Sequence, residues 1–211
     1  MEKILKNEQG YLMDVGCLKF ATVSEEHSCL YNKEHFSGVK RFNVSCGIGF
    51  DAAVCEEALH SKMKEFVNRF KMGKLVYLCI ALKQLIKAKR VSCDLYLDEN
   101  EPIHVKGLLF VACMNHKYEG GGFMFGPDAD YQDGFLDLCV VGNIPKPLIL
   151  LALPTAMKGK HFGFPCIEKY RAREVRIKIS ESLWVHTDGE VYVKSDDIYI
   201  KNESTKMRMI V

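Results

Sequence analysis

The segment WVHTDGEVYV at residues 184–193 carries three side chains capable of acid–base chemistry. His186, Asp188 and Glu190 alternate, so on an extended backbone they would share one face, whereas a turn would place Asp188 at its tip. Asp-Gly between runs of alternating apolar residues is a strong signal for a two-residue hairpin turn, because both residues tolerate positive φ. In either arrangement a carboxylate is exposed and able to act as a general base. The segment is therefore either a turn alone or a turn that also carries a reaction site.

A second segment, NHKYEGGGFMFGPDADYQDGFLDL at residues 115–138, is dense in glycine and aspartate. Consecutive glycines permit backbone conformations that other residues resist, so a loop that folds closely over a ligand is one interpretation. Asp130 and Asp133, with backbone carbonyls nearby, could supply the oxygen ligands that Mg²⁺ or Ca²⁺ prefers. The spacing is not that of an EF-hand, and the closing Glu is missing. The alternative is a surface loop made of residues that favour turns.

A third segment, NVSCGIGFDA at residues 43–52, places Gly47 and Gly49 around one apolar residue, followed by Asp51. Two glycines in this pattern, without a third, are a weak sign of phosphate binding. Close backbone packing where a strand meets a helix explains them about as well. The segment alone does not decide between these interpretations.

The elements that must position these residues are mostly strands. Residues 1–54 alternate or cluster apolar residues between Gly, Asn and Ser, which predicts three or four strands. Between Ala52 and Arg90 the apolar spacing changes to three and four, which predicts two helices broken near Gly73. A short helix is expected around PLILLALPTAMKG, and further strands at VSCDLYLD, HVKGLLFVACMN, FLDLCVVG, EVRIKIS, LWVHT, EVYV and DIYIK. The pattern favours a mainly β (α+β) fold, a β-sandwich or barrel with one two-helix insertion.

Composition narrows the functional classes. The chain has 211 residues, 48% hydrophobic and 27% charged, enough for one sizeable core or two small ones. Its net charge of +2 gives no support for a nucleic-acid binder held by phosphate neutralisation. Nine cysteines are spread singly, with no zinc-site spacing, and most are expected to be buried residues in a reducing cytoplasm. The N-terminus lacks the apolar core of a signal peptide, and PLILLALP is too short to span a bilayer.

The predicted helices between residues 52 and 90 are rich in basic residues. One interpretation is a surface that approaches anionic lipid headgroups, with each charge contributing about 1 kcal/mol. The other is an ordinary solvated helix face, balanced by Glu56, Glu57 and Glu65. The basic residues concerned are Lys62, Lys64, Arg69, Lys71, Lys74, Lys83, Lys87, Lys89 and Arg90.

The motifs, taken in order, resemble the catalytic-domain family of diacylglycerol kinases, which includes bacterial lipid kinases and, more distantly, sphingosine and ceramide kinases. The resemblance is carried by GIGFDA, G-K-L-V-Y-L at 73–78, Asn115 followed by GGG, P-D-A-x-x-x-D-G-F-L-D-L, GKHF at 159–162 and HTDGE. It covers the C-terminal domain of that family, from about Tyr11 to Lys201. The resemblance implies a β-sandwich related to that of NAD kinases, which carries the lipid-binding portion of the enzyme and closes one side of an interdomain cleft.

The resemblance also implies roles for individual residues. Asp188 would be the general base for a lipid hydroxyl that attacks the γ-phosphate of ATP. Glu190 would be a second catalytic residue that assists at the nucleotide and metal site, next to Gly189. A structural Mg²⁺ would be held by the side chains of Asp130 and Asp133 and by backbone oxygens near Pro127 and Phe135. The candidates for the substrate cleft are Gly47, Gly49, Asp51, Asn115, Gly121 and Gly122.

One departure from the family pattern affects the expected activity. Nothing like the glycine-rich GGDGT segment of the family's nucleotide-binding domain occurs in these 211 residues. We therefore expect residues 1–211 to be a single C-terminal domain with half an ATP site and, alone, little or no kinase activity. Its expected partners are a lipid at the inner membrane surface, an N-terminal nucleotide-binding domain on the same or a separate chain, and a second copy in a homodimer; nucleic acid is not expected. The alternatives are a non-catalytic lipid- or ligand-binding module and an NAD kinase-like phosphotransferase.

Overall fold

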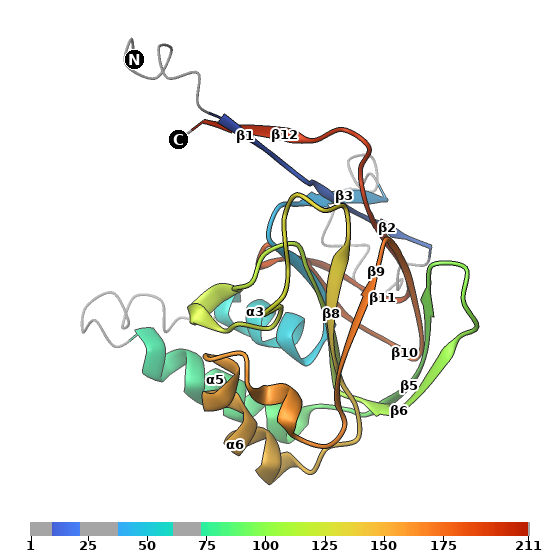
Figure 1. Ribbon diagram of the computed structural model, residues 1–211. Coiled ribbons are helices and arrows are strands. Elements are labelled where there is room, and N and C mark those ends of the chain that lie inside the picture. The colour runs from blue at the N-terminus through green and yellow to red at the C-terminus, as the bar shows by residue number, and fades with distance from the viewer. Residues whose placement is uncertain (1–9, 22–37, 61–72, 211) are drawn as a thin grey trace.

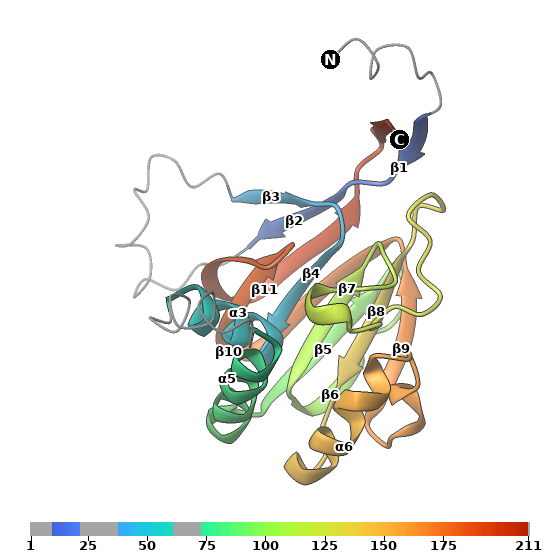
Figure 2. The same cartoon turned by 90° about the vertical axis from the view of Figure 1, so that its left-hand side faces the viewer.

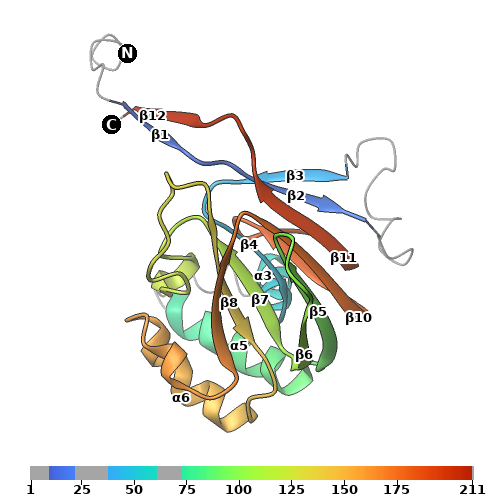
Figure 3. The ribbon, with the colours of Figure 1, turned by 45° about the vertical axis from the view of Figure 1, so that its right-hand side comes forward.

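A long hairpin shared by two sheets organises the fold. The computed structural model describes residues 10–21, 38–60 and 73–210. The hairpin consists of β10 (Glu174–Thr187) and β11 (Glu190–Asn202). The first half of β10 pairs with β5 (Val91–Leu97), and its end pairs with β4 (Ser45–Gly49). A register shift against β11 between Lys178 and Leu183 separates the two halves, so that one strand belongs to both layers (Figure 3).

The remaining strands extend the two layers. The hydrogen-bonded order is β3-β2-β11-β10-β4-β7-β8-β9, with β5 pairing to β10 and β6. A separate two-stranded sheet pairs β1 with β12, next to the chain ends in Figure 1. These strands are β1 (Gly10–Met13), β2 (Gly16–Phe20), β3 (Val39–Phe42), β6 (Ile103–Leu108), β7 (Phe110–Met114), β8 (Leu136–Val141), β9 (Ile167–Ala172) and β12 (Met207–Ile210).

The main core lies between the two layers and is built by strict alternation. On β7, Val111 and Cys113 face this core, whereas Phe110, Ala112 and Met114 face a second core beneath the helices. The main core also takes Leu95 and Ile177 from the β5–β10 layer and Leu138 from the β8 side. The predicted β-sandwich is thus confirmed. Of the eight described cysteines, five are buried.

Three α-helices cover the outer face of the β4–β7–β8 layer (Figure 2). They are α3 (Phe50–His60), α5 (Gly73–Lys87) and α6 (Lys146–Ala156), with short 3₁₀ turns η2 (Gly120–Gly122) and η3 (His161–Gly163). The start of α5 agrees with the predicted break at Gly73, and the predicted short helix is α6. None of the described helices has the length and hydropathy that a bilayer-spanning helix needs.

The predicted strand boundaries were wrong at two places. The segments EVRIKIS and LWVHT form one strand, β10, and EVYV and DIYIK form another, β11. The run HVKGLLFVACMN is divided at Leu109 into β6 and β7. Strand β9 was not predicted, because only its end residues Ile167 and Ala172 are buried and its middle residues are partly or fully exposed.

Candidate active site

The HTDGE segment forms the turn of the long hairpin. Thr187 pairs with Glu190, which leaves Asp188 (φ 49°) and Gly189 (φ 83°) as the two turn residues. Positive φ at both positions is what the Asp-Gly pattern predicts. The three polar side chains do not share one face: His186 is buried, whereas Asp188 and Glu190 are exposed.

Asp188 is anchored to the backbone of the β3–β4 connection. Its Oδ2 accepts a hydrogen bond from the amide of Asn43 at 2.8 Å, and its Oδ1 accepts from Val44 at 2.9 Å and Ser45 at 3.0 Å. The Asp188 amide in turn donates to the carbonyl of Ser45 at 2.9 Å. These bonds fix the carboxylate at the exposed tip of the turn, and Oδ2 keeps capacity for one more hydrogen bond.

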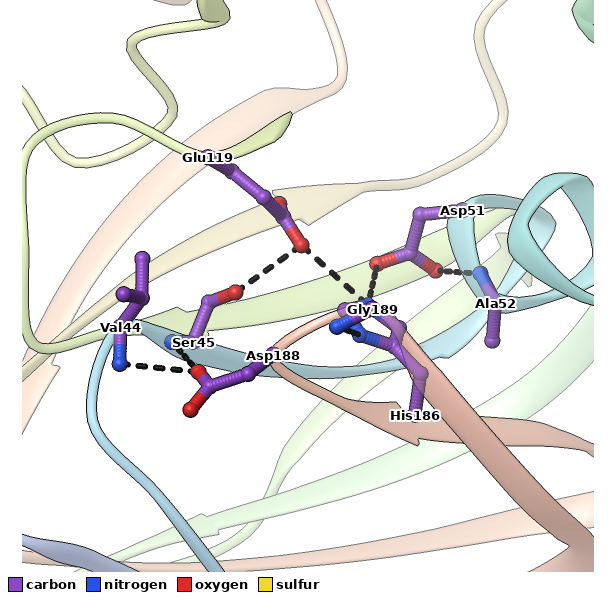
Figure 4. A network of polar contacts seen from close by, with 8 residues as sticks. All are labelled: Val44, Ser45, Asp51, Ala52, Glu119, His186, Asp188 and Gly189. Carbon is purple, nitrogen blue, oxygen red and sulfur yellow. Dashed lines mark hydrogen bonds and ion pairs between the residues drawn. The ribbon is translucent and has the colours of Figure 1, made fainter. Parts of the chain in front are cut away.

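Beside the turn, His186 lies between two carboxylates (Figure 4). Its Nε2 is 3.2 Å from Oδ2 of Asp51 and 3.3 Å from Oε1 of Glu119. The same Glu119 oxygen accepts a hydrogen bond from the hydroxyl of Ser45 at 2.9 Å. The His186 ring is fully buried, and the two carboxylates are only 11% and 14% exposed. We call Ser45, Asp51, Glu119 and His186 the polar cluster.

Gly47 makes the polar cluster possible. A Cβ at this position would lie 2.1 Å from Oδ2 of Asp51 and 2.7 Å from Nε2 of His186, so no larger residue fits. Gly49 has φ 112° at the junction where β4 enters α3. Both glycines of the GxG pattern are thus explained by close packing where a strand meets a helix, and not by phosphate binding.

The triple-glycine loop places Glu119. The loop is closed by a hydrogen bond from the Glu119 amide to the carbonyl of Phe123 at 2.8 Å, and Gly121 and Gly122 have φ 80° and 86°. Both glycines are exposed. The loop brings the Glu119 side chain onto His186, although Glu119 was absent from the predicted site residues. A glutamate directly before three glycines was the available signal.

The polar cluster holds its protons tightly. Burial alone would lower the pKa of His186, but the carboxylates of Asp51 and Glu119 reverse this effect and raise it to about 9. Burial raises the pKa of Glu119, against the opposing charge of His186. Both pKa values are raised, so the polar cluster keeps one extra proton. This proton reduces the repulsion between the two buried carboxylates.

His186, Asp51 and Glu119 also offer three ligand atoms within 4.8 Å of one another, a spacing that would suit a metal ion. The surroundings of His186 argue against this use. Its Nε2 lies at hydrogen-bond distance from both carboxylate oxygens, 3.2 and 3.3 Å, as expected where a proton on Nε2 joins the three groups. The arrangement suits an Nε2–H shared between two carboxylates.

Asn115 lies beside the β3–β4 connection that anchors Asp188. It is 1% exposed, and among the described residues its side-chain amide has no hydrogen-bond partner. Its backbone amide donates to the carbonyl of Val44 at 2.8 Å. The next residue, His116, stacks on Tyr131; burial lowers its pKa, and the charge of Asp188 opposes this effect. The predicted cleft residue Asn115 thus bonds to the same β3–β4 connection that anchors Asp188.

The predicted Mg²⁺ loop uses its oxygens internally. Oδ1 of Asp130 accepts from the amide of Gln132, and Oδ1 of Asp133 accepts from the amide of Phe135. The other oxygen of Asp133 pairs with the Arg171 guanidinium.

Two further bonds brace this loop. The carbonyl of Phe135 accepts from the side chain of Asn202 at 3.3 Å, and buried Asp14 accepts from the amide of Gly134 at 2.7 Å. Pro127 lies in the same loop, but no hydrogen bond joins its carbonyl to these groups. Asp133 is thus neutralised by Arg171, and an ion at this loop would have to displace that pair.

Glu190 follows the turn and is exposed. Its Oε2 accepts a hydrogen bond from the hydroxyl of Tyr192 at 3.0 Å, and that hydroxyl accepts from Thr187 at 3.1 Å. Gly189 has open space around its Cα. Both residues thus border solvent next to Asp188, where the sequence predicted nucleotide contacts.

An apolar cavity of about 60 Å³ reaches Asp51 from beneath the helices. Its walls are almost entirely apolar and come from α3, β7, β8, α6, η3 and β9, together with Phe125. His161 lines it, and burial lowers the pKa of this histidine to about 4, so the ring is neutral at physiological pH. The wall residues include Phe50, Phe110, Phe125, Ile149 and Ala152.

The matched family model decides the relationship. Residues 44–198 match the YegS C-terminal NAD kinase beta sandwich-like domain. The chain belongs to this family. The match contains β4, the polar cluster and the Asp188 turn.

Two curated relatives extend the comparison. The chain is 28% identical to the diacylglycerol kinase of Mycobacterium tuberculosis over 72% of its length and 46% of the relative's. It is also 28% identical to YtlR of Bacillus subtilis, described as a candidate lipid kinase, over 74% of the chain and 50% of the relative. The chain thus spans about half the length of these relatives.

A solved structure shows the same fold. The crystal structure of a candidate diacylglycerol kinase from Bacillus anthracis aligns with 99% of the chain and 59% of that protein, with a TM-score of 0.63 and 19% identity. The resemblance to lipid-kinase C-terminal domains and the sandwich fold of the YegS C-terminal family are therefore confirmed.

Proposed function

We propose that the chain is the lipid-binding and base-carrying domain of an ATP-dependent lipid kinase that phosphorylates a diacylglycerol-like hydroxyl. The observation that carries the proposal is the Asp188 carboxylate, fixed at an exposed turn by three backbone amides. Membership of the YegS C-terminal family and relatives named as diacylglycerol kinases support it.

Asp188 suits a phosphoryl transfer in which positioning dominates. The transition state of such reactions is loose in most analyses, so the protein mainly orients the attacking hydroxyl and stabilises charge. ATP would supply the phosphoryl group when bound. The free capacity of Oδ2 in Asp188 would accept the hydroxyl proton and hold the acceptor oxygen in line. No step is assigned to Mg²⁺ at the Asp130–Phe135 loop, because Asp133 is paired with Arg171.

The polar cluster would position this base. His186 is two residues from Asp188, and Ser45 both donates its amide to Asp188 and its hydroxyl to Glu119. The end of β10, the start of α3 and the triple-glycine loop are thus joined at the turn. Asp51 and Glu119 are positioning residues in this proposal.

The apolar cavity supports a lipid acceptor. Asp51 is one of its lining residues, so an apolar chain bound there with its polar end toward Asp51 would place that end near the turn. Its present volume holds only a few methylene groups, each contributing about 0.8 kcal/mol when buried. The phosphates of ATP would be held largely by a nucleotide-binding domain, on which the activity of the chain depends, and the enzyme would act at the inner membrane surface.

Transfer of label from radioactive ATP tests the proposal. The natural protein and the 211-residue chain are each given diacylglycerol vesicles or NAD, with and without a nucleotide-binding domain from a relative. We expect labelled phosphatidic acid only when the nucleotide-binding domain is present. Label in NAD would identify an NAD kinase-like enzyme, and lipid binding without any transfer would identify a binding module; either result contradicts the proposal.

A further inference from the structure

Helix α6 exposes an unusually apolar outer face. Ile149, Ala152 and Ala156 are buried against the sheet. On the opposite side, at spacings of three and four, lie the residues that we call the α6 face: Pro147, Leu150, Leu151, Pro154 and Met157. Leu151 is 63% exposed, Met157 46% and Leu150 42%. A surface helix normally carries polar residues here, so this face calls for a covering environment.

The surroundings of the α6 face are basic. Lys146 begins the helix, and Lys158 and Lys160 follow its end. No aspartate or glutamate occurs in the 30 residues between Asp137 and Glu168. An apolar helix face with lysines at both ends, and no nearby acid in sequence, is the pattern of helices that lie in the interface of an anionic bilayer.

The neighbouring helix continues the same character. The ammonium group of Lys146 donates to the carbonyl of Ile86 at 2.7 Å, which joins the end of α5 to the start of α6. Ile86 is 77% exposed. Figures 1 to 3 show the two helices side by side, at the end of the molecule away from β1 and β12. Exposed apolar residues therefore continue from α6 onto α5.

We infer that the α6 face docks onto an anionic lipid surface, with Leu150, Leu151 and Met157 entering the headgroup region and Lys158 and Lys160 contacting lipid phosphates. The inference rests on the proposed function, because a lipid acceptor must be reached from a membrane. The apolar cavity is walled by the buried side of the same helix, through Ile149, Ala152 and Ala156. Docking by α6 would bring that cavity close to the bilayer.

Charge favours a membrane over a second copy of the chain as the occupant. A two-fold interface brings the same patch of both subunits together. Lys158 and Lys160 of one copy would then lie near their own counterparts, and like charges across an interface are unfavourable. An anionic bilayer instead offers negative charge to each lysine.

Co-sedimentation with vesicles tests the docking surface. The full chain is mixed with vesicles of phosphatidylglycerol and phosphatidylcholine in equal amounts, or of phosphatidylcholine alone, and the bound fraction is measured. We expect binding to the anionic vesicles to fall about tenfold or more in the double variant Leu150→Gln/Leu151→Gln. The double variant Lys158→Glu/Lys160→Glu should also bind less, and raised salt should weaken wild-type binding.

Two matched controls come from the opposite end of the molecule. Leu12 on β1 is 54% exposed, and Lys19 on β2 is also exposed. Leu12→Gln and Lys19→Glu should leave vesicle binding unchanged. All substituted side chains are exposed, so the variants should fold, which circular dichroism checks.

Three results would overturn the inference: no wild-type binding to anionic vesicles, an equal loss in the control variants, or a dimer that Leu150→Gln/Leu151→Gln dissociates in light scattering.

Phosphorylation of dispersed dioctanoylglycerol by the natural protein separates this inference from the proposed function. Activity on that acceptor that persists when vesicle binding is lost supports docking by α6. Absent kinase activity with the expected vesicle binding counts against the proposed function and leaves the docking surface supported.

Discussion

Nε2 of His186 lies 3.2 Å from Oδ2 of Asp51, directly over the Cα of Gly47. This buried contact joins the end of β10 to the first turn of α3. Because His186 is two residues before Asp188, the contact sets where the hairpin turn and its carboxylate lie. Three predictions concern this arrangement, and a fourth concerns the Asp130–Phe135 loop.

Gly47→Ala should destabilise the protein by about 1–3 kcal/mol, the usual range for an overpacked site. The new methyl group would fall 2.1 Å from Oδ2 of Asp51 and force that carboxylate away from His186. Chemical denaturation measures the effect. Gly163→Ala is the control, since a Cβ there meets nothing within 4 Å; equal costs at both positions would contradict the packing argument.

Asp188→Asn in the natural protein should lower kcat by about 10²–10⁴-fold, the contribution typical of a general base. The side-chain NH₂ group of the new asparagine would also face one of the backbone N–H groups that Asp188 now accepts from. This should cost about 1 kcal/mol in unfolding free energy. Steady-state kinetics and denaturation measure the two effects.

Asp98→Asn is a matched control for this substitution. Asp98 also has positive φ, 54°, and accepts hydrogen bonds from two backbone amides, those of Arg173 and Glu174. Because both amides donate to the same oxygen, Oδ1, the asparagine of this variant can keep both bonds. It should therefore lose less stability than Asp188→Asn and keep full activity. Unchanged turnover in Asp188→Asn would rule out Asp188 as the base.

The unfolding free energy should fall as pH rises from about 6.5 to 9. The pKa of His186 is raised to about 9 in the folded protein from an ordinary 6.5, and that of Glu119 is also raised. Groups with raised pKa values stabilise the fold below their ordinary pKa and lose this effect as pH passes the folded value. A loss of roughly 1–3 kcal/mol is expected.

Denaturation at several pH values in Glu119→Gln tests the source of this pH dependence. Removing one buried carboxylate should flatten the profile above pH 6.5, because one of the two buried negative charges is gone. Glu190→Gln, an exposed position beside the same turn, should leave the profile as it is. A profile with the opposite slope in the wild-type chain would show that the polar cluster does not retain its proton.

Wild-type Tm should respond little to Mg²⁺ or EDTA, because Arg171 already pairs with Asp133. Arg171→Met should lower the unfolding free energy by up to about 1 kcal/mol, as expected for a partly exposed ion pair. It should also make Tm rise with added Mg²⁺, since ion binding to the native state stabilises it. Thermal unfolding measures both. A large fall of the wild-type Tm in EDTA would instead indicate a bound ion in the Asp130–Phe135 loop.

The sequence predicted the fold where local pattern and packing agree. The apolar run of β8 and the change of spacing at Gly73 were clear, and these elements lie where expected. The division at Leu109 was hidden because both sides of it are apolar. There the chain passes from the layer that contains β5 to the layer that contains β4, and a continuous apolar run carries no mark of such a crossing.

The site was partly predictable for a similar reason. The Asp188 turn is a local feature, and Asp-Gly reveals it. The contact between Glu119 and His186 joins segments far apart in the chain, so no spacing rule could find it. The pairing of Asp133 with Arg171 was also hidden. Arg171 belongs to β9, a strand with too few buried residues to be recognised from the sequence.

The basic helix surface is only partly described. Lys83 pairs with Glu57 and Lys89 with Glu181, which supports a solvated, balanced face for these two residues. Residues 61–72, which hold Lys62, Lys64, Arg69 and Lys71, lie outside the described part of the chain. The ninth cysteine, Cys29, also lies outside it.

Strand β10 has two register shifts against β11, between Lys178 and Leu183 and between Trp184 and His186. Its inward alternation continues across the first of them, from Ile179 to Val185. Val185 faces the main core and His186 the opposite side. Deleting a single residue from this stretch would exchange those two orientations, because side chains alternate along a strand. The HTDGE letters would remain, yet the histidine would point into an apolar core. Natural variation in length here should therefore come in pairs of residues, because only an even change keeps His186 on the side of the polar cluster.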